Sequence, residues 1–178
     1  TRLRIAATAF ESQEGMLVTN RDRVILQVNS AFTAITGYSA AEAVGQNPRF
    51  LSSGRNKASF YRSMFEGVER TNSWQGEIWN RRKNGEVYPQ WLTITAVRDA
   101  DNEITHYVST LTDITQRKAA EKEIENLAFY DSLTQLPNRR LLMDRLKQSL
   151  LASARSGHHA ALMLLDLDKF KTVNDTLG

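Results

Sequence analysis

Two acidic residues directly follow an apolar run near the end of the sequence, where they could help to hold a metal ion. The run spans residues 160–165 and is followed by Asp166-Leu167-Asp168. A continuous apolar run of this length predicts a strand buried on both faces, and ligand groups gather where the strands of an α/β sheet end. A carboxylate there suits Mg²⁺, which prefers hard oxygen ligands and is commonly shared with substrate phosphates. The alternative is that Asp166 and Asp168 form a solvated strand end.

Three other side chains have the chemistry to contact a bound small molecule. An indole can stack on a flat ring and an amide can both donate and accept hydrogen bonds, so Trp74 and Asn80 suit a heteroaromatic ligand. Asn29 is a further pocket candidate. Each has a structural alternative: Trp74 belongs to the core, Asn80 satisfies strand backbone, and Asn29 caps a helix.

The densest basic run is Arg81-Arg82-Lys83, which stands just before Asn84-Gly85. Asn-Gly is a strong hairpin-turn signal, so we interpret the run as a solvated hairpin tip. The net charge of +3 arises from 23 basic and 20 acidic residues spread over the whole length. This small imbalance gives no support to a nucleic-acid partner.

Composition excludes several classes of site. The 178 residues are 41% hydrophobic and 24% charged, which is ordinary globular usage, and there is no cysteine. Disulfides, cysteine zinc sites, iron-sulfur clusters and covalently attached haem are therefore excluded, and a cytoplasmic location is consistent with the composition.

No apolar run approaches the roughly 20 residues needed to span a bilayer. The chain starts without Met, and we expect it to be a piece of a longer protein.

The periodicity of the first part predicts an α+β fold. Residues 3–13 have helical spacing, and a hairpin turning at residues 21–23 follows. Short helix signals occupy residues 29–72 and end with a longer helix over about residues 57–70. Strand signals follow at residues 74–80, 87–97 and 104–111. This order predicts a curved five-stranded antiparallel sheet with short helices over one face and a pocket between the two layers.

The second part is expected to begin with a linker helix. Residues 116–127 are rich in Ala, Glu and Lys, with Thr115 placed to cap them. Ala120, Ile124 and Leu127 have the 4-then-3 spacing of a coiled-coil seam, which favours a homodimer. The alternative is a helix lying against its own domain. An amphipathic helix over about residues 138–156 then leads into the predicted strand, as in a truncated α/β unit.

Residues 3–115 resemble the PAS sensory domain family, and residues 128–178 resemble the opening of a GGDEF diguanylate cyclase domain. The resemblance predicts a PAS domain over residues 1–115, a signalling linker helix over 116–127 and the start of a GGDEF domain over 128–178. The PAS motifs are Val28-Asn29-Ser30-Ala31-Phe32, Ile35-Thr36-Gly37-Tyr38-Ser39, Gly45-Gln46-Asn47-Pro48-Arg49, Trp74-Gln75-Gly76-Glu77, Asn80-Arg81-Arg82-Lys83-Asn84-Gly85 and Asp113-Ile114-Thr115. The GGDEF motifs run from Asp131 to Arg140 and from Asp166 to Asp175.

The GGDEF resemblance implies roles for four residues. Asp166 and the Leu167 carbonyl would hold Mg²⁺, Lys171 would contact phosphate and Asn174 would bind the guanine edge of GTP. A helix-surface amide is the alternative for Asn174. The intact protein would join two GTP molecules into cyclic di-GMP. The signature that names the family is absent from these residues, so we expect the chain itself not to be catalytic.

The PAS resemblance allows several cofactors, which the residues narrow down. Pro48 stands where light-sensing flavin domains have their reactive cysteine, so no cysteine-flavin adduct forms. Histidines occur at 106, 158 and 159, away from the helix near residues 57–70 that supplies the axial ligand in haem-binding relatives, which disfavours haem. Non-covalent FAD remains, with Trp74 beside its ring and Asn80 at its polar edge. An empty pocket or an unidentified small molecule is the alternative.

The resulting hypothesis is a cytoplasmic signal-input module that regulates a GGDEF output. Asp113 and Thr115 stand where the last strand becomes the linker helix, so a small strand shift there would reach the output. A first alternative is a ligand-free dimerisation scaffold whose pocket is filled by Phe32, Trp74 and Trp91. A second is a degenerate GGDEF domain that regulates an attached phosphodiesterase.

Overall fold

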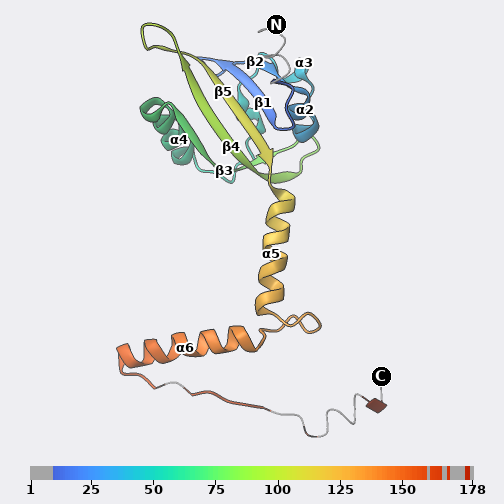
Figure 1. Cartoon of the computed structure of the whole chain (residues 1–178), viewed down its shortest axis with the longest axis vertical. Coiled ribbons are helices and arrows are strands. Elements are labelled where there is room, and N and C mark those ends of the chain that lie inside the picture. The colour runs from blue at the N-terminus through green and yellow to red at the C-terminus, as the bar shows by residue number, and fades with distance from the viewer. Residues whose placement is uncertain (1–9, 160, 166–167, 169–174, 177–178) are drawn as a thin grey trace. The chain divides into compact units, whose positions relative to one another are not determined.

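The first part of the chain forms a five-stranded antiparallel sheet in the order β2-β1-β5-β4-β3 (Figure 1). The computed structural model describes residues 10–159, 161–165, 168, 175 and 176. The strands are β1 Gly15–Asn20, β2 Ile25–Val28, β3 Ser73–Arg81, β4 Val87–Arg98 and β5 Ile104–Asp113. The predicted α+β sheet is confirmed, including the hairpin that turns after Asn20.

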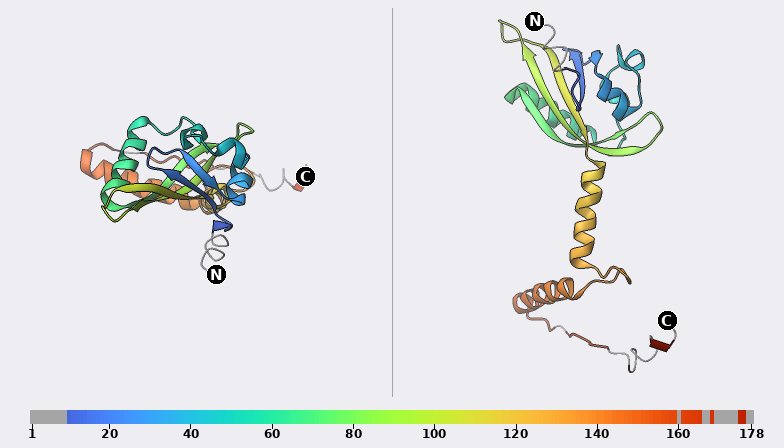
Figure 2. Two further views of the ribbon diagram at one scale, coloured as in Figure 1. Left: turned by 90° about the horizontal axis from the view of Figure 1, so that it is seen from above. Right: turned by 45° about the vertical axis from the view of Figure 1, so that its right-hand side comes forward.

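Short helices connect β2 to β3 and lie together on one side of the sheet (Figures 1 and 2). They are α2 Ser30–Thr36, α3 Ala40–Ala43, the 3-10 helix η1 Pro48–Leu51 and α4 Ala58–Thr71. Their starts follow from local chemistry. Asn29 accepts a hydrogen bond from the backbone of Phe32 at the start of α2, and Ser39 forms a reciprocal capping box with Glu42 at the start of α3.

Alternation along the strands creates the core between sheet and helices. In β4, Leu92 and Ile94 face inward and are buried, whereas Trp91 is 37% exposed on the opposite face. Phe32 of α2 and Val68 of α4 are fully buried against this inner face. Removing these side chains from water is the main driving force for covering the sheet with helices.

A second compact unit covers residues 121–178, while the first covers residues 1–120. Helix α5 Thr115–Phe129 runs across this division, and α6 Arg139–Ser156 belongs to the second unit. Asn138 caps α6 by accepting hydrogen bonds from the backbones of Arg140 and Leu141. The boundaries predicted from the sequence, after residues 115 and 127, remain a proposal.

Two expectations from the sequence are corrected in this part of the chain. A buried strand was predicted over residues 160–165, but residues 161–165 have no regular secondary structure, Leu165 is 90% exposed, and residue 160 lies outside the described residues. A strand needs neighbours to pair its backbone groups, and residues 161–165 pair with no strand in the part of the chain that the structure describes. Thr115 was predicted to cap the linker helix, but it is the first residue of α5, and Asp113 supplies the oxygen that accepts its N–H.

Other expectations concern the ends of the chain and the membrane. The helix predicted over residues 3–13 falls largely outside the described residues. Among the residues that are described, no helix has the length and apolar character needed to cross a membrane.

Candidate functional site

A cavity of about 720 Å³ lies between the inner face of the sheet and the helices η1 and α4. The wall is mainly apolar and includes side chains from strands and helices: Leu17, Leu51, Met64, Leu92, Ile94 and Leu111. The predicted pocket between the two layers is therefore present. Its volume is within the range of small-molecule sites, about 300–1,000 Å³.

Four polar side chains interrupt this apolar wall at buried positions. They are Thr19, Asn80, Gln90 and Ser109, each no more than 6% exposed. The side chains of Asn80, Thr19 and Ser109 make no hydrogen bond to any residue within the described ranges, and only the oxygen of Gln90 is engaged. Buried polar groups are normally paired, so these groups are suited to hydrogen bonds with an occupant of the cavity.

Three arginines lie at the lining of the same cavity. Arg23, Arg49 and Arg62 have no ion-pair partner among the residues that the structure describes, although the Arg23 guanidinium lies 3.8 Å from the ring centroid of Phe65. An unpaired guanidinium binds carboxylate or phosphate through a fork of N–H donors. Glu66 and Glu69 also line the cavity, but the three arginines outnumber them, so the site can combine an apolar body, a hydrogen-bonding edge and an anionic group in one ligand.

The other two predicted pocket residues do not line the cavity. The Asn29 amide is fully used in structure: it accepts from the backbones of Met16 and Phe32 and donates to the carbonyls of Phe10 and Glu14. Its capping role is therefore observed.

Trp74 is half-buried between α4 and its own strand rather than at the cavity wall. Its ring meets that of Phe60 edge-on, with 5.8 Å between centroids. Gly76 makes room for this indole, because a Cβ at that position would lie 2.7 Å from the ring. The core alternative for Trp74 matches this placement.

The ligand-free alternative expected Phe32, Trp74 and Trp91 to fill the pocket, and the structure does not place them there. Phe32 is buried in the core, and Trp91 points from the opposite face of β4. None of the three belongs to the cavity wall.

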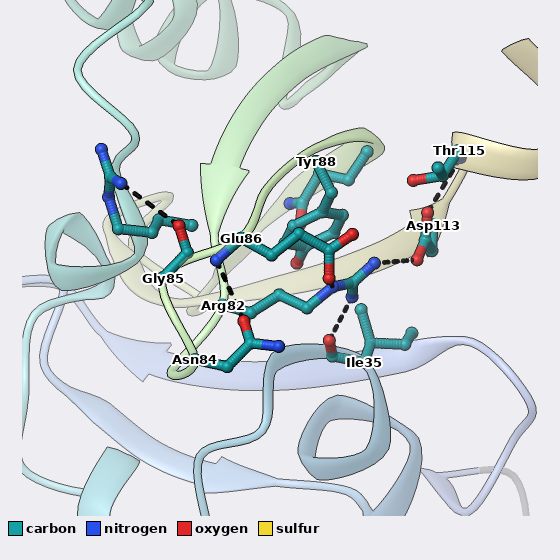
Figure 3. Close-up of polar contacts among 10 residues, drawn as sticks. Ile35, Arg82, Asn84, Gly85, Glu86, Tyr88, Asp113 and Thr115 are labelled. Carbon is teal, nitrogen blue, oxygen red and sulfur yellow. Dashed lines mark hydrogen bonds and ion pairs between the residues drawn. The ribbon is translucent and has the colours of Figure 1, made fainter.

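A second polar cluster surrounds Arg82 at the β3–β4 hairpin (Figure 3). The guanidinium donates to Asp113, 2.5 Å away, to Glu86 at 3.0 Å and to the backbone carbonyl of Ile35. It also lies 3.8 Å from the ring centroid of Tyr88. One side chain therefore joins the helix layer, the hairpin and the end of β5.

The interpretation of the basic run as a solvated hairpin tip is wrong for Arg82, whereas Arg81 and Lys83 are exposed as expected. The Arg82 side chain is only 16% exposed, and Lys83 pairs with Glu42 across 2.5 Å. The hairpin itself is as predicted, with Asn84 accepting a hydrogen bond from the Glu86 backbone in the turn. The tight Asn-Gly turn brings these cations back onto the helices, which composition alone could not reveal.

Asp113 connects this cluster to α5. Its second oxygen accepts the backbone N–H of Thr115 at 2.9 Å (Figure 3). Partial burial alone would raise the pKa of Asp113, but hydrogen bonds from Thr115 and Arg82 and the charge of Arg82 outweigh burial, so the pKa is lowered. The carboxylate is thus held in its charged form where β5 becomes α5.

The sequence profile of the PAS domain family matches residues 13–116, which is more than half of the chain. The chain belongs to the PAS domain family. The profile of the diguanylate cyclase, GGDEF domain matches residues 128–178 of this PAS protein. Both resemblances inferred from the motifs are therefore confirmed.

Similar proteins share parts of this chain. A nitrogen fixation regulatory protein of Klebsiella oxytoca is 32% identical over 102 residues, 57% of this PAS chain and 21% of that protein. The bifunctional diguanylate cyclase/cyclic di-GMP phosphodiesterase MucR of Pseudomonas aeruginosa is 48% identical over 59 residues, 33% of this chain and 9% of MucR. A solved light-oxygen-voltage domain studied with a flavin analogue superposes with a TM-score of 0.56 at 25% identity, covering 70% of this chain and 94% of that domain. The chain thus spans about a fifth or less of the curated relatives.

The residues predicted to bind Mg²⁺ and GTP remain untested by this geometry. Asp166, Leu167, Lys171 and Asn174 lie outside the described residues. Within the described ranges, no three His, Cys, Asp or Glu side chains cluster as a metal site would require.

Sequence reasoning missed the residues that join the cavity to α5, namely Arg82, Tyr88 and Gln90. A partial signal existed, since the alternation of β4 places Gln90 on the same face as Leu92. A polar residue on an apolar face is a candidate pocket residue.

Proposed function

We propose that this chain is the sensory part of a cytoplasmic signalling protein in which the PAS cavity controls a GGDEF domain. That domain would make cyclic di-GMP from two GTP molecules. Asp166 and the Leu167 carbonyl would hold Mg²⁺, with Lys171 at phosphate and Asn174 at guanine. Support comes from the order of the two family matches along the chain. The relative MucR adds to it, because its name gives it both a diguanylate cyclase and a cyclic di-GMP phosphodiesterase activity.

The observation that carries the sensory role is the cavity with its unpaired polar groups. We propose a heteroaromatic ligand with a donor-acceptor edge and an anionic group, and FAD is the first candidate. The amides of Asn80 and Gln90 suit the polar edge of a flavin, and the arginines at the cavity suit its phosphates. When bound, FAD would supply reversible redox chemistry, which makes the pocket a redox sensor.

The deciding experiment is the absorption spectrum of freshly purified protein, followed by mass analysis of anything released on denaturation. Flavin bands and released FAD are expected. Asn80→Leu should lower the flavin content at least several-fold by removing hydrogen bonds, whereas Asn84→Leu at the hairpin turn should not. A colourless protein that releases nothing contradicts FAD and leaves a weakly held metabolite for the same site.

Regulation is tested separately in the full-length protein. Asp113→Ala should change the dependence of cyclic di-GMP production on the signal, because it removes the acceptor at the start of α5. Asp99→Ala is the matched control, since Asp99 accepts backbone hydrogen bonds in the exposed β4–β5 turn. Unchanged regulation in Asp113→Ala would contradict a relay through this junction.

We also propose that the chain forms a homodimer through α5. Ile124 and Leu127 are 67% and 64% exposed, with the spacing of a coiled-coil seam. Sedimentation should show a concentration-dependent dimer that Ile124→Glu weakens, while Glu125→Gln on the same helix should leave it intact. A monomer at all concentrations would contradict this assembly.

A further inference from the structure

The cavity wall contains a buried glutamine whose side-chain oxygen already accepts a hydrogen bond from a neighbouring tyrosine. Gln90 is 1% exposed, lines the cavity, and accepts a hydrogen bond from the Tyr88 hydroxyl at 2.9 Å. The NH₂ group of Gln90 has no hydrogen-bond partner in the part of the chain that the structure describes. Anything in the cavity that binds this amide therefore acts on the group that fixes Tyr88.

Tyr88 passes this constraint to Arg82. Tyr88 is 1% exposed, and its ring lies 3.8 Å from the Arg82 guanidinium carbon. Burial raises the pKa of Tyr88, so its hydroxyl stays protonated and remains a donor to Gln90. A cation held over a desolvated ring is attracted to it, so the position of the ring helps to set the position of the guanidinium.

Arg82 in turn orients the acceptor at the start of α5. One oxygen of Asp113 accepts from Arg82 and the other from the backbone of Thr115 (Figure 3). The same junction has a backbone link, because the N–H of Ile114 donates to the carbonyl of Pro89, next to Gln90. Gln90 and Asp113 are also register partners in the β4–β5 ladder.

We propose that Gln90, Tyr88 and Arg82 form a coupling path by which the occupant of the cavity alters the order of the first turn of α5. This inference rests on the proposed sensory function and names the positioning residues through which it acts. A ligand that hydrogen-bonds to Gln90 competes with or reinforces its bond to Tyr88. The shift then reaches Asp113 through Arg82, without any ligand contact to α5.

The path is testable without a ligand by amide hydrogen exchange on the 178-residue chain. Tyr88→Phe keeps the ring but removes the hydroxyl that bonds to Gln90. The N–H groups of Thr115 and Lys118 donate to Asp113 and Ile114 and report the start of α5. They should exchange roughly three- to tenfold faster in Tyr88→Phe, beyond any change in the amides of β1.

Tyr61→Phe is the matched control, because Tyr61 also lines the cavity but its hydroxyl pairs with Ser52, away from Arg82. It should leave the two α5 amides within about twofold of their original rates. Equal acceleration of every amide in Tyr88→Phe would mean general destabilisation and would overturn the path, as would no change at α5.

A double variant strengthens the test. Gln90→Leu should accelerate the same α5 amides, and Gln90→Leu with Tyr88→Phe should add little, because both changes break one contact. If the acceleration of exchange in the double variant equals the product of the accelerations in the two single variants, the path is overturned. The exchange experiment needs neither a ligand nor GTP. The path can therefore fail while FAD binding is found, or be supported while FAD binding is not found, so the two proposals are tested independently.

Discussion

The guanidinium of Arg82 lies 2.5 Å from the carboxylate of Asp113, although the two residues are 31 positions apart in the sequence. The two side chains come from the β3–β4 hairpin and the last residue of β5. Both are partly buried, at 16% and 29% exposure. A charge pair in this setting is less screened by water than a surface pair, and removing one partner leaves the other without compensation.

Asp113→Ala should therefore destabilise the PAS domain by about 1–3 kcal/mol, since it removes an ionic hydrogen bond and the acceptor for Thr115. Glu86→Ala removes the other carboxylate partner of Arg82, which is 51% exposed, and should cost less than about 1 kcal/mol. Urea unfolding followed by tryptophan fluorescence measures both. Equal losses of unfolding free energy in the two variants would contradict the inference that Asp113 stabilises the domain more than Glu86 does.

The sequence predicted the sheet, the helices and the cavity, because these depend on alternation, capping residues and turns that are local in the chain. It also placed Asp113 and Thr115 at the junction of β5 and α5. It did not predict that Arg82 leaves the solvent, and it left open whether Trp74 lines the cavity or belongs to the core. Both depend on contacts between distant segments, such as Arg82 with Ile35 and Trp74 with Phe60.

The two glycines beside Trp74 provide a paired test of packing. In Gly76→Ala the new Cβ would lie 2.7 Å from the indole ring, so the ring or the strand must move, at an expected loss of about 1–3 kcal/mol. Gly67 lies within α4, and in Gly67→Ala the Cβ would lie 3.4 Å from the same ring, which is an ordinary van der Waals contact. Alanine favours a helix by about 1 kcal/mol over glycine, so Gly67→Ala should be neutral or stabilising. Thermal unfolding distinguishes them, and a harmless Gly76→Ala would contradict this placement of Trp74.

The 178-residue chain should make no measurable cyclic di-GMP from GTP and Mg²⁺. Phosphoryl transfer of this kind depends on metal ions and on groups that position both nucleotides, and the chain contains only the opening of the GGDEF domain. Chromatography of reaction mixtures with mass detection provides the measurement, with a complete diguanylate cyclase as the positive control. Detectable product that is lost in Asp166→Asn would show that these residues are sufficient for catalysis.

Stability should fall in acid partly through the clamp between Lys83 and Glu42. The hydrogen bond from Lys83 and those from Ser39 lower the pKa of Glu42 from 4.5 to about 2. A carboxyl whose pKa is lowered by folding stabilises the folded state above its unfolded pKa. This contribution is therefore complete at neutral pH and is lost as the pH falls from 4.5 to about 2.

Glu42→Gln should accordingly flatten the decline of the urea midpoint between pH 5 and pH 2, since glutamine has no proton to gain. Glu103→Gln, in the exposed β4–β5 turn, is the control and should keep the wild-type slope. Asp113 contributes in the same direction, because its pKa is also lowered, so some acid sensitivity should remain in Glu42→Gln. An unaltered acid slope in Glu42→Gln would mean that the contact between Lys83 and Glu42 does not hold the hairpin to α3 in solution.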